Sequence, residues 1–128
     1  MTNDKIKFDL EERTGRFGAD VINFAKTLPK NSIINPITSQ LIRSATSVGA
    51  NYCEADDAQS RADFKHKIAI CKKEARETVH WLKMVIVADP NTEEKAKKLG
   101  QEAKELNLIF NAIIKKTEAN SVINNLKN

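Results

Sequence analysis

The sequence predicts an all-α protein built as an up-down-up-down bundle of four helices. A chain of 128 residues that is 41% hydrophobic can bury one core of ordinary size. Only four Gly and three Pro are present, too few for the many tight turns of a β-sandwich or barrel. Four stretches also repeat apolar residues at alternating spacings of three and four, which is typical of helices buried on one face. Such faces leave water by packing together in a bundle.

The first helix follows a polar lead-in over residues 1–8 and ends before Pro29, which cannot continue a helix. Its apolar face consists of Leu10, Thr14, Phe17, Val21, Phe24 and Leu28. Asn35 is predicted to cap the second helix, with Pro36 in the first helical position, where a missing N–H does no harm. The second apolar face consists of Thr38, Leu41, Ala45, Val48, Tyr52 and Ala55.

Ser60 and Asp63 resemble a capping box, so a third helix is predicted from Arg61 to the Asp89-Pro90 pair. Its apolar face consists of Phe64, Ile68, Cys71, Ala75, Thr78, Leu82 and Val85. Asn91, with Glu94 three residues later, is predicted to cap the fourth helix. That helix has the apolar face Ala96, Leu99, Ala103, Leu106, Phe110 and Ile113. The bundle domain is therefore expected over residues 9–115, with a polar, fraying tail over 116–128.

Residue types that carry catalysis are few. The candidates are Cys53, Cys71, His66 and His80, but Cys71 lies on an apolar face, where a thiol behaves as a small buried hydrophobe. His66, Cys71 and His80 are spaced so that their side chains leave the helix at scattered angles, which disfavours a metal site. Phosphate-binding, dinucleotide-binding, zinc-protease and di-iron motifs are absent. We expect no enzyme activity, metal or cofactor.

Two cysteines are too few for a disulfide scaffold and suit a reducing compartment. The N-terminal residues show no apolar signal region, and no segment approaches the ~18 apolar residues of a membrane span. A cytoplasmic location is the expectation.

The second helix contains a run of small residues that would let a neighbouring backbone approach closely: Ser44, Ala45, Thr46, Ser47, Gly49 and Ala50. Gly49 weakens the helix by about 1 kcal/mol relative to Ala, which packing has to offset. Arg43 and Glu54 fall on one side of this helix, which also carries Asn51. Both an interface and an exposed surface are consistent with these polar side chains.

The third helix holds the charge excess. It carries seven Lys or Arg and three Asp or Glu, and this balance of +4 equals the net charge of the chain. At 100° per residue, five of the cations fall within ~60° of one another, whereas Glu74 and Glu77 lie toward the opposite flank. The five are Arg61, Lys65, Lys72, Arg76 and Lys83. We call them the basic stripe.

A stripe of this length can follow a phosphate backbone, with affinity that falls as salt rises and depends little on sequence. Few aromatic residues accompany it, so stacking on unpaired bases is not indicated. Two alternatives stay open, a solvated face and a docking site for an acidic protein partner. Another cationic group that could contact a polyanion starts the fourth helix and consists of Lys95, Lys97 and Lys98.

Two stretches carry a family resemblance: SQLIRSATSVGANYCEA from Ser39 to Ala55, and DFKHKIAICKKEARETVHWLKM from Asp63 to Met84. Together with FDLEERTGRFGADV and KKLGQEAKELNLIF, they cover roughly residues 8 to 113. The chain resembles the four-helix bundle family of 23S rRNA intervening-sequence proteins. A related branch is the accessory variability determinant of diversity-generating retroelements.

The resemblance implies a homo-oligomer, typically a pentameric ring with a basic surface, that associates with RNA or DNA and has no enzymatic activity. In the retroelement branch it implies a reverse transcriptase as partner. The family's pattern on the second helix is matched by Arg43, Ser44, Asn51 and Glu54, with Gly49 inside it. For these residues the resemblance favours subunit or helix packing.

Overall fold

The fold is given by a computed structural model, which describes the backbone of residues 2–127 and the side chains of residues 10–126. Four α-helices follow one another along the chain, and the described residues form no strand. They are α1 (Thr2–Lys26), α2 (Ile34–Asp56), α3 (Arg61–Ala88) and α4 (Glu93–Lys127), with a 3₁₀ turn, η1 (Pro90–Thr92), before α4. The all-helical prediction is confirmed.

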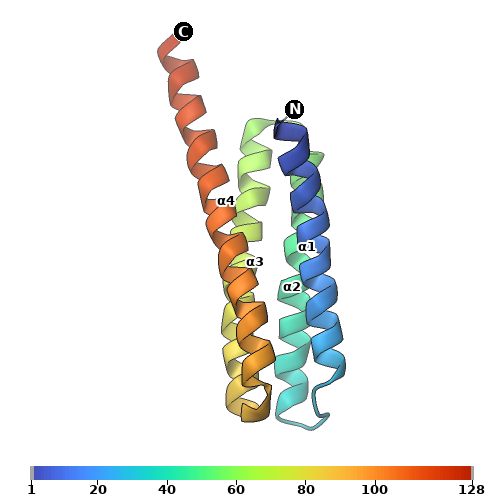
Figure 1. The fold of residues 1–128 in the computed structure, drawn as a ribbon. Helices are drawn as coiled ribbons and strands as arrows, with labels where there is room; N and C mark the ends of the chain where they lie inside the picture. The colour runs from blue at the N-terminus through green and yellow to red at the C-terminus, as the bar shows by residue number, and fades with distance from the viewer. Residues whose placement is uncertain (1, 128) are drawn as a thin grey trace.

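The helices run alternately up and down and form a bundle (Figure 1). Each helix packs against the next one in sequence, and α1 and α4 contact each other less extensively than these consecutive pairs do. The C-terminal half of α4 leans away from the other helices and projects past the end of the bundle where α3 begins (Figure 1).

The core confirms the apolar faces predicted from spacing. Every residue predicted on the face of α1 is buried, from Leu10 to Leu28. On the other helices the predicted positions are buried or half-buried, and the largest fully buried side chains include Phe17 and Phe110. Burial of this shared apolar surface provides the driving force that holds the helices together.

Three of the predicted helix starts are wrong. The α1 helix begins at Thr2, inside the stretch predicted as a polar lead-in over residues 1–8. The side-chain oxygen of Asn31, not Asn35, accepts from the N–H groups of Ile33 and Ile34 at 3.0 and 2.9 Å. The α2 helix therefore begins at Ile34, and Pro36 still lies in the first turn, where no intrahelical donor is needed. Before α4, Asp89 caps the 3₁₀ turn η1 and accepts from the Asn91 N–H at 3.2 Å. Asn91 lies inside η1, and α4 begins at Glu93.

The third helix begins as predicted. The Ser60 side chain accepts from the Asp63 N–H at 3.1 Å, and α3 runs from Arg61 to Ala88. The predicted fraying beyond Lys115 is wrong, since α4 continues as helix to Lys127. Within residues 2–127, no helix is long and apolar enough to cross a membrane.

Candidate nucleic-acid interface

An open groove runs between α3 and α4 and is rimmed by cationic side chains. From α3 it is lined by Lys72, Lys73, Arg76, His80 and Lys83, and from α4 by Lys104, Asn107 and Leu108. The groove exists because α3 and α4 are antiparallel neighbours, with their apolar faces turned toward the core. Their outer flanks then leave a channel between them.

The basic stripe divides into two parts along α3. Arg76 and Lys83 line the groove and form no ion pair or hydrogen bond with any side chain in the described part of the chain. Lys72, which also lines it, donates from Nζ to the Asn111 side-chain oxygen at 3.0 Å. Three members of the stripe therefore reach the groove.

The other two members, Arg61 and Lys65, contact the projecting end of α4. Lys65 Nζ lies 3.0 Å from a carboxylate oxygen of Glu118. The Arg61 guanidinium lies against Asn124, whose amide oxygen accepts from it at 3.2 Å in the orientation that pairs donors with acceptors. The charge of Lys65 is partly balanced within the chain, so these two residues are less available to a polyanion than the groove residues are.

Three of the lining residues that carry a basic side chain were not assigned to the site from the sequence. Lys73 and His80 lie on α3 outside the angular range of the stripe, and Lys104 lies on α4. The His80 ring packs edge-on against Trp81, with ring centroids 4.8 Å apart. A wider angular window on α3 would have included Lys73 and His80, but Lys104 joins them only because α4 packs beside α3.

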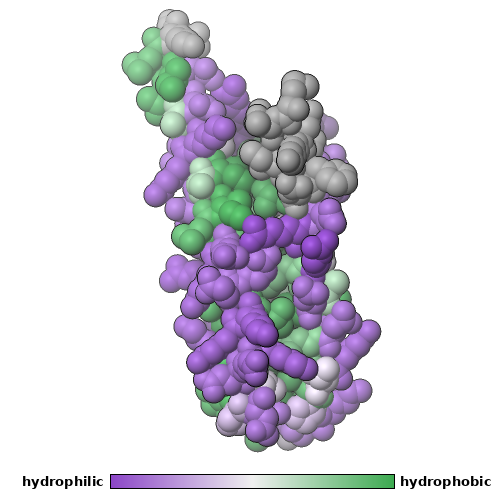
Figure 2. Space-filling view, in the orientation of Figure 1, coloured by the Kyte–Doolittle hydropathy of each residue, from purple (hydrophilic) through white to green (hydrophobic). Residues whose placement is uncertain are grey.

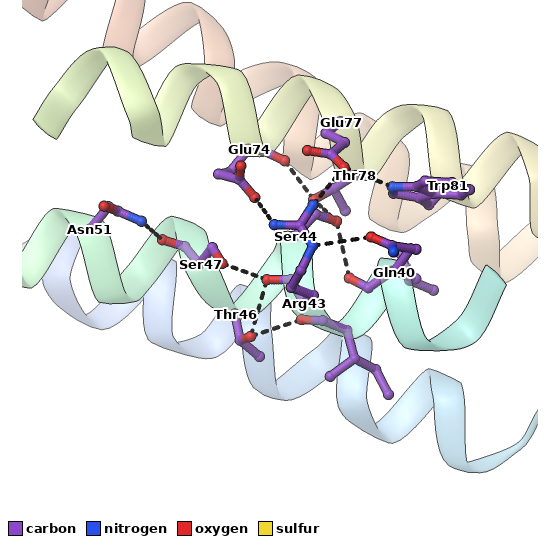
Figure 3. Close-up of polar contacts among 12 residues, drawn as sticks. Gln40, Arg43, Ser44, Thr46, Ser47, Asn51, Glu74, Glu77, Thr78 and Trp81 are labelled. Atoms are coloured by element: carbon purple, nitrogen blue, oxygen red, sulfur yellow. Dashed lines mark hydrogen bonds and ion pairs between the residues drawn. The ribbon is translucent and has the colours of Figure 1, made fainter. Parts of the chain in front are cut away.

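A polar cluster anchored on Arg43 joins α2 to α3 at the edge of this groove (Figure 3). The Arg43 guanidinium donates to Glu74 at 3.0 Å and to Glu77 at 2.5 Å. Its third donor, Nε, reaches Gln40 at 3.1 Å, and the Trp81 indole N–H donates to the same Glu77 oxygen at 3.1 Å. Among the described residues that line the groove, Glu77 is the one acid, and Arg43 and Trp81 already bind its carboxylate.

The electrostatics follow from these contacts. The hydrogen bond from Arg43, with a second from Trp81, holds the pKa of Glu77 below its ordinary value of 4.5. Hydrogen bonding to Glu77 in turn raises the pKa of Arg43. Glu77 is therefore ionised at neutral pH, and its charge is balanced chiefly by α2, which leaves the groove cations in excess.

Ser44 lies beneath this cluster and is fully buried between α2 and α3. The Thr78 hydroxyl lies 3.0 Å from Ser44 Oγ and 2.8 Å from the Glu74 carbonyl oxygen. Ser44 itself donates to the Leu41 carbonyl at 3.1 Å. The hydroxyl groups of these short side chains thus have hydrogen-bond partners where α2 and α3 pack closely.

The remaining residues predicted for packing lie at different contacts. Asn51 donates to the Ser47 carbonyl of its own helix at 2.8 Å. Glu54 forms a surface ion pair with Lys67 of α3 at 2.6 Å. At Gly49 the backbone of α1 approaches so closely that an added Cβ would lie 3.4 Å from the Thr14 carbonyl oxygen. Arg43 and Glu54 thus each have an acidic or basic partner on α3 of the same chain.

The two thiols lie in different environments. Cys53 is exposed, whereas Cys71 is buried with Sγ 3.5 Å from the Val48 carbonyl oxygen. Burial raises the pKa of the Cys71 thiol to about 12. His66 is exposed on α3, and within the described residues no three His, Cys, Asp or Glu side chains come together as a metal site.

These features define a helical bundle with a cationic groove between its third and fourth helices. Comparison with known proteins gives the family: residues 7–112 match the model of the 23S rRNA-intervening sequence protein family. The chain belongs to this family. A search among curated proteins found no match.

A solved structure supports the assignment. It is a protein of unknown function from the S23 ribosomal protein family of Bacteroides thetaiotaomicron VPI-5482, and its sequence is 33% identical. The likeness covers 85% of this chain and 97% of that one, with a TM-score of 0.74.

Proposed function

We propose that the protein is a non-enzymatic nucleic-acid-binding bundle that holds phosphate backbones in the α3–α4 groove. The observation that carries the proposal is the convergence of Lys73, Arg76, Lys83 and Lys104 on one groove, where none of them forms an ion pair with a described side chain. Cations gathered in excess over acids attract a polyanion and release its counterions on binding. The family's description names 23S rRNA intervening sequences, which makes RNA the first ligand to test.

The groove is better suited to contact with a phosphate backbone than to recognition of bases. Its cations on α3 extend from Lys72 to Lys83, about 17 Å along the helix, a length over which a duplex presents about ten phosphates. The aromatic rings beside it, His80 and Trp81, pack against each other rather than forming a row of stacking platforms. Affinity is therefore expected to depend strongly on salt and weakly on sequence.

The proposal includes self-association. The family resemblance supports a homo-oligomer, with a pentameric ring as its specific form, acting as a scaffold in a ribonucleoprotein or beside a reverse transcriptase. Repetition of the groove around an assembly would raise avidity without any new contact.

A salt titration tests the groove directly. Binding of the wild-type protein to unrelated RNA and DNA duplexes should be tight at low salt and fall steeply as salt rises. Reversing two groove cations, Arg76→Glu with Lys83→Glu, should lower affinity at low salt and reduce the slope of log K against log salt by roughly two units. Sequence preference should not change.

The matched control reverses two exposed cations near the α1–α2 turn, Lys26→Glu with Lys30→Glu, which alters net charge equally. Equal loss in both variants would show that overall charge, not the groove, governs binding. If affinity falls only when Lys95, Lys97 and Lys98 are replaced by glutamate, the nucleic-acid contact lies at the start of α4 instead. Failure of the wild-type protein to bind at any salt concentration would favour an acidic protein as the partner of the groove.

A further inference from the structure

The α4 helix carries a second apolar face that points away from the bundle. Its residues recur at spacings of four, three, four, three and four, and at 100° per residue they fall within ~80° of one another. They are Leu108, Ala112, Lys115, Ala119, Val122 and Leu126. We call this set the outer seam.

The side chains of the outer seam are exposed to solvent, unlike those of the core. Leu108, Val122 and Leu126 are 68%, 58% and 82% exposed, and the other three members are exposed as well. The buried residues of the same helix, such as Leu106 and Phe110, lie on the opposite side. Figure 2 shows hydrophobic side chains on the part of α4 that projects past the bundle. A helix with apolar heptad spacing on two opposite sides has one side for its own bundle and one available for another helix.

We infer that the outer seam pairs with the outer seam of a second copy, with the two α4 helices antiparallel and related by a two-fold axis beside Thr117. The seam is self-complementary in that arrangement, because the antiparallel second helix places a side chain of compatible size opposite each member of the seam. The facing pairs are Leu108 with Leu126, Ala112 with Val122, and Lys115 with Ala119. Two-fold interfaces require this kind of self-matching surface.

Charge favours the antiparallel orientation. Lys115 is the one polar member of the seam and forms no ion pair with a described side chain. In a parallel pair two Lys115 side chains would occupy the same core layer, where like charges repel. In the antiparallel pair each Lys115 stem packs against the small Ala119, and its ammonium group comes close to Glu118 of the second copy. Glu118 has half of its side chain exposed beyond its contact with Lys65.

The seam also lies largely outside the region shared with the family. The family match ends at residue 112, and the seam extends to Leu126. It is a contact of two-fold type, unlike the head-to-tail contact of a ring, and it does not rest on nucleic-acid binding. A seam of about 27 Å is shorter than a standard protein interface, so we expect micromolar affinity.

The first test measures assembly mass by analytical ultracentrifugation over a range of concentrations. The wild-type assembly should contain an even number of copies, and Val122→Asp with Leu126→Asp should halve its mass. The matched control, Ile33→Asp with Val87→Asp, places the same charges on apolar residues that are equally exposed but lie outside the seam. It should leave the mass unchanged, and circular dichroism should show equal helicity in all three proteins.

Several masses would overturn the inference: a wild-type monomer at ~100 μM, an odd-numbered assembly with no even-numbered species, or an unchanged mass in the seam variant. A fall from an odd-numbered ring to monomers would instead assign the seam to the ring contact.

Disulfide trapping tests the orientation, in a Cys53→Ser background that removes the exposed native thiol. A mixture of Leu108→Cys and Leu126→Cys proteins should form a cross-linked dimer of the two variants. Neither variant should cross-link with itself, because identical positions lie about 27 Å apart in the antiparallel pair. Self-cross-linking of each variant, with none in the mixture, would show parallel pairing and overturn the two-fold antiparallel arrangement.

Discussion

Arg43 is the residue whose contacts bear most on both stability and the groove. Its guanidinium joins a carboxylate with only 9% of its side chain exposed, Glu74, to a second carboxylate, Glu77. Three donors in a rigid fork can serve both acids and Gln40 at once, which a lysine ammonium on a flexible stem does less well. The cluster thus pairs the charge of Glu77, an acid that lines the groove, with Arg43 of α2.

Replacing Arg43 by alanine should lower the free energy of unfolding by about 1–3 kcal/mol, since the nearly buried Glu74 carboxylate loses its ionic partner. Arg43→Lys should recover part of that loss. Urea denaturation at neutral pH measures both. Glu54→Ala is the control, because it removes a surface ion pair with Lys67 that should contribute no more than about 1 kcal/mol. Equal losses of unfolding free energy in the Arg43→Ala and Glu54→Ala variants would contradict the larger contribution assigned to Arg43.

The same cluster predicts a pH dependence. Because the pKa of Glu77 is lower in the folded protein than its ordinary value of 4.5, the unfolded chain binds the proton more readily. The stabilisation is complete above pH 4.5 and is lost as pH falls through the lower, folded pKa. Unfolding free energies measured between pH 6 and 3 should therefore fall more steeply for the wild-type protein than for Arg43→Ala. Parallel curves would show that Arg43 does not set this pKa.

The two cysteines should differ sharply in reactivity. Cys53 is exposed, whereas burial of Cys71 raises its pKa to about 12 and leaves it protonated at neutral pH. A thiol reagent should modify Cys53 at least about 100-fold faster than Cys71 in the native protein, and both should react alike in urea. Mass spectrometry of the labelled peptides distinguishes them. Rapid native labelling of Cys71 would contradict its place in the core.

At the scale of the element, the α1–α2 contact depends on small residues. The Thr14 carbonyl lies 3.4 Å from where a Cβ at Gly49 would be, whereas nothing lies within 4 Å of a Cβ added at Gly15. A methyl group can be accommodated at both positions, but a long side chain at Gly49 would meet the backbone of α1. Close packing therefore depends on the length of the side chain at this position rather than on glycine's backbone freedom.

Gly15→Ala should raise the free energy of unfolding by up to about 1 kcal/mol, since it adds helix propensity in open space. Gly49→Leu should lower it by about 1–3 kcal/mol because the helices are forced apart. Denaturant titration measures the free energy of unfolding of both variants. Gly49→Ala, with the shorter side chain, should have a stability between theirs. Tolerance of leucine at position 49 would show that α1 and α2 separate easily there.

At the scale of the whole molecule, the bundle and the projecting end of α4 have separate roles. The buried core on α4 ends at Phe110, whereas the contacts to Lys65 and Arg61 come from Glu118 and Asn124. The projection therefore contributes little to the core but covers two cations of the basic stripe and carries half of the outer seam.

Deleting residues 116–128 should leave the helicity of the remaining chain intact and lower the melting temperature by less than about 8 °C. At protein concentrations below the micromolar affinity of the outer seam, binding to duplex RNA at low salt should not weaken, because Lys65 loses its acidic partner and the groove is untouched. Melting curves and the salt titration test this. A truncated protein that fails to fold would show that the projection belongs to the folding unit.

The sequence alone determined the helical architecture, the apolar faces and the start of α3 at Ser60, because these depend on spacing and capping within a few residues. It also located the excess positive charge on α3. It did not reveal the hydrogen bonds that Asn31 accepts at the start of α2. It also did not reveal the continuation of α4 to Lys127, since the polar residues after Lys115 lack an inward apolar face.

Only the tertiary structure decided which of the cations stay unpaired. Lys65 meets Glu118, Arg43 meets Glu74 and Glu77, and Lys104 joins the groove from another helix. These contacts depend on how antiparallel helices are aligned along their lengths, and the 3.6-residue period of a single helix carries no information about that alignment.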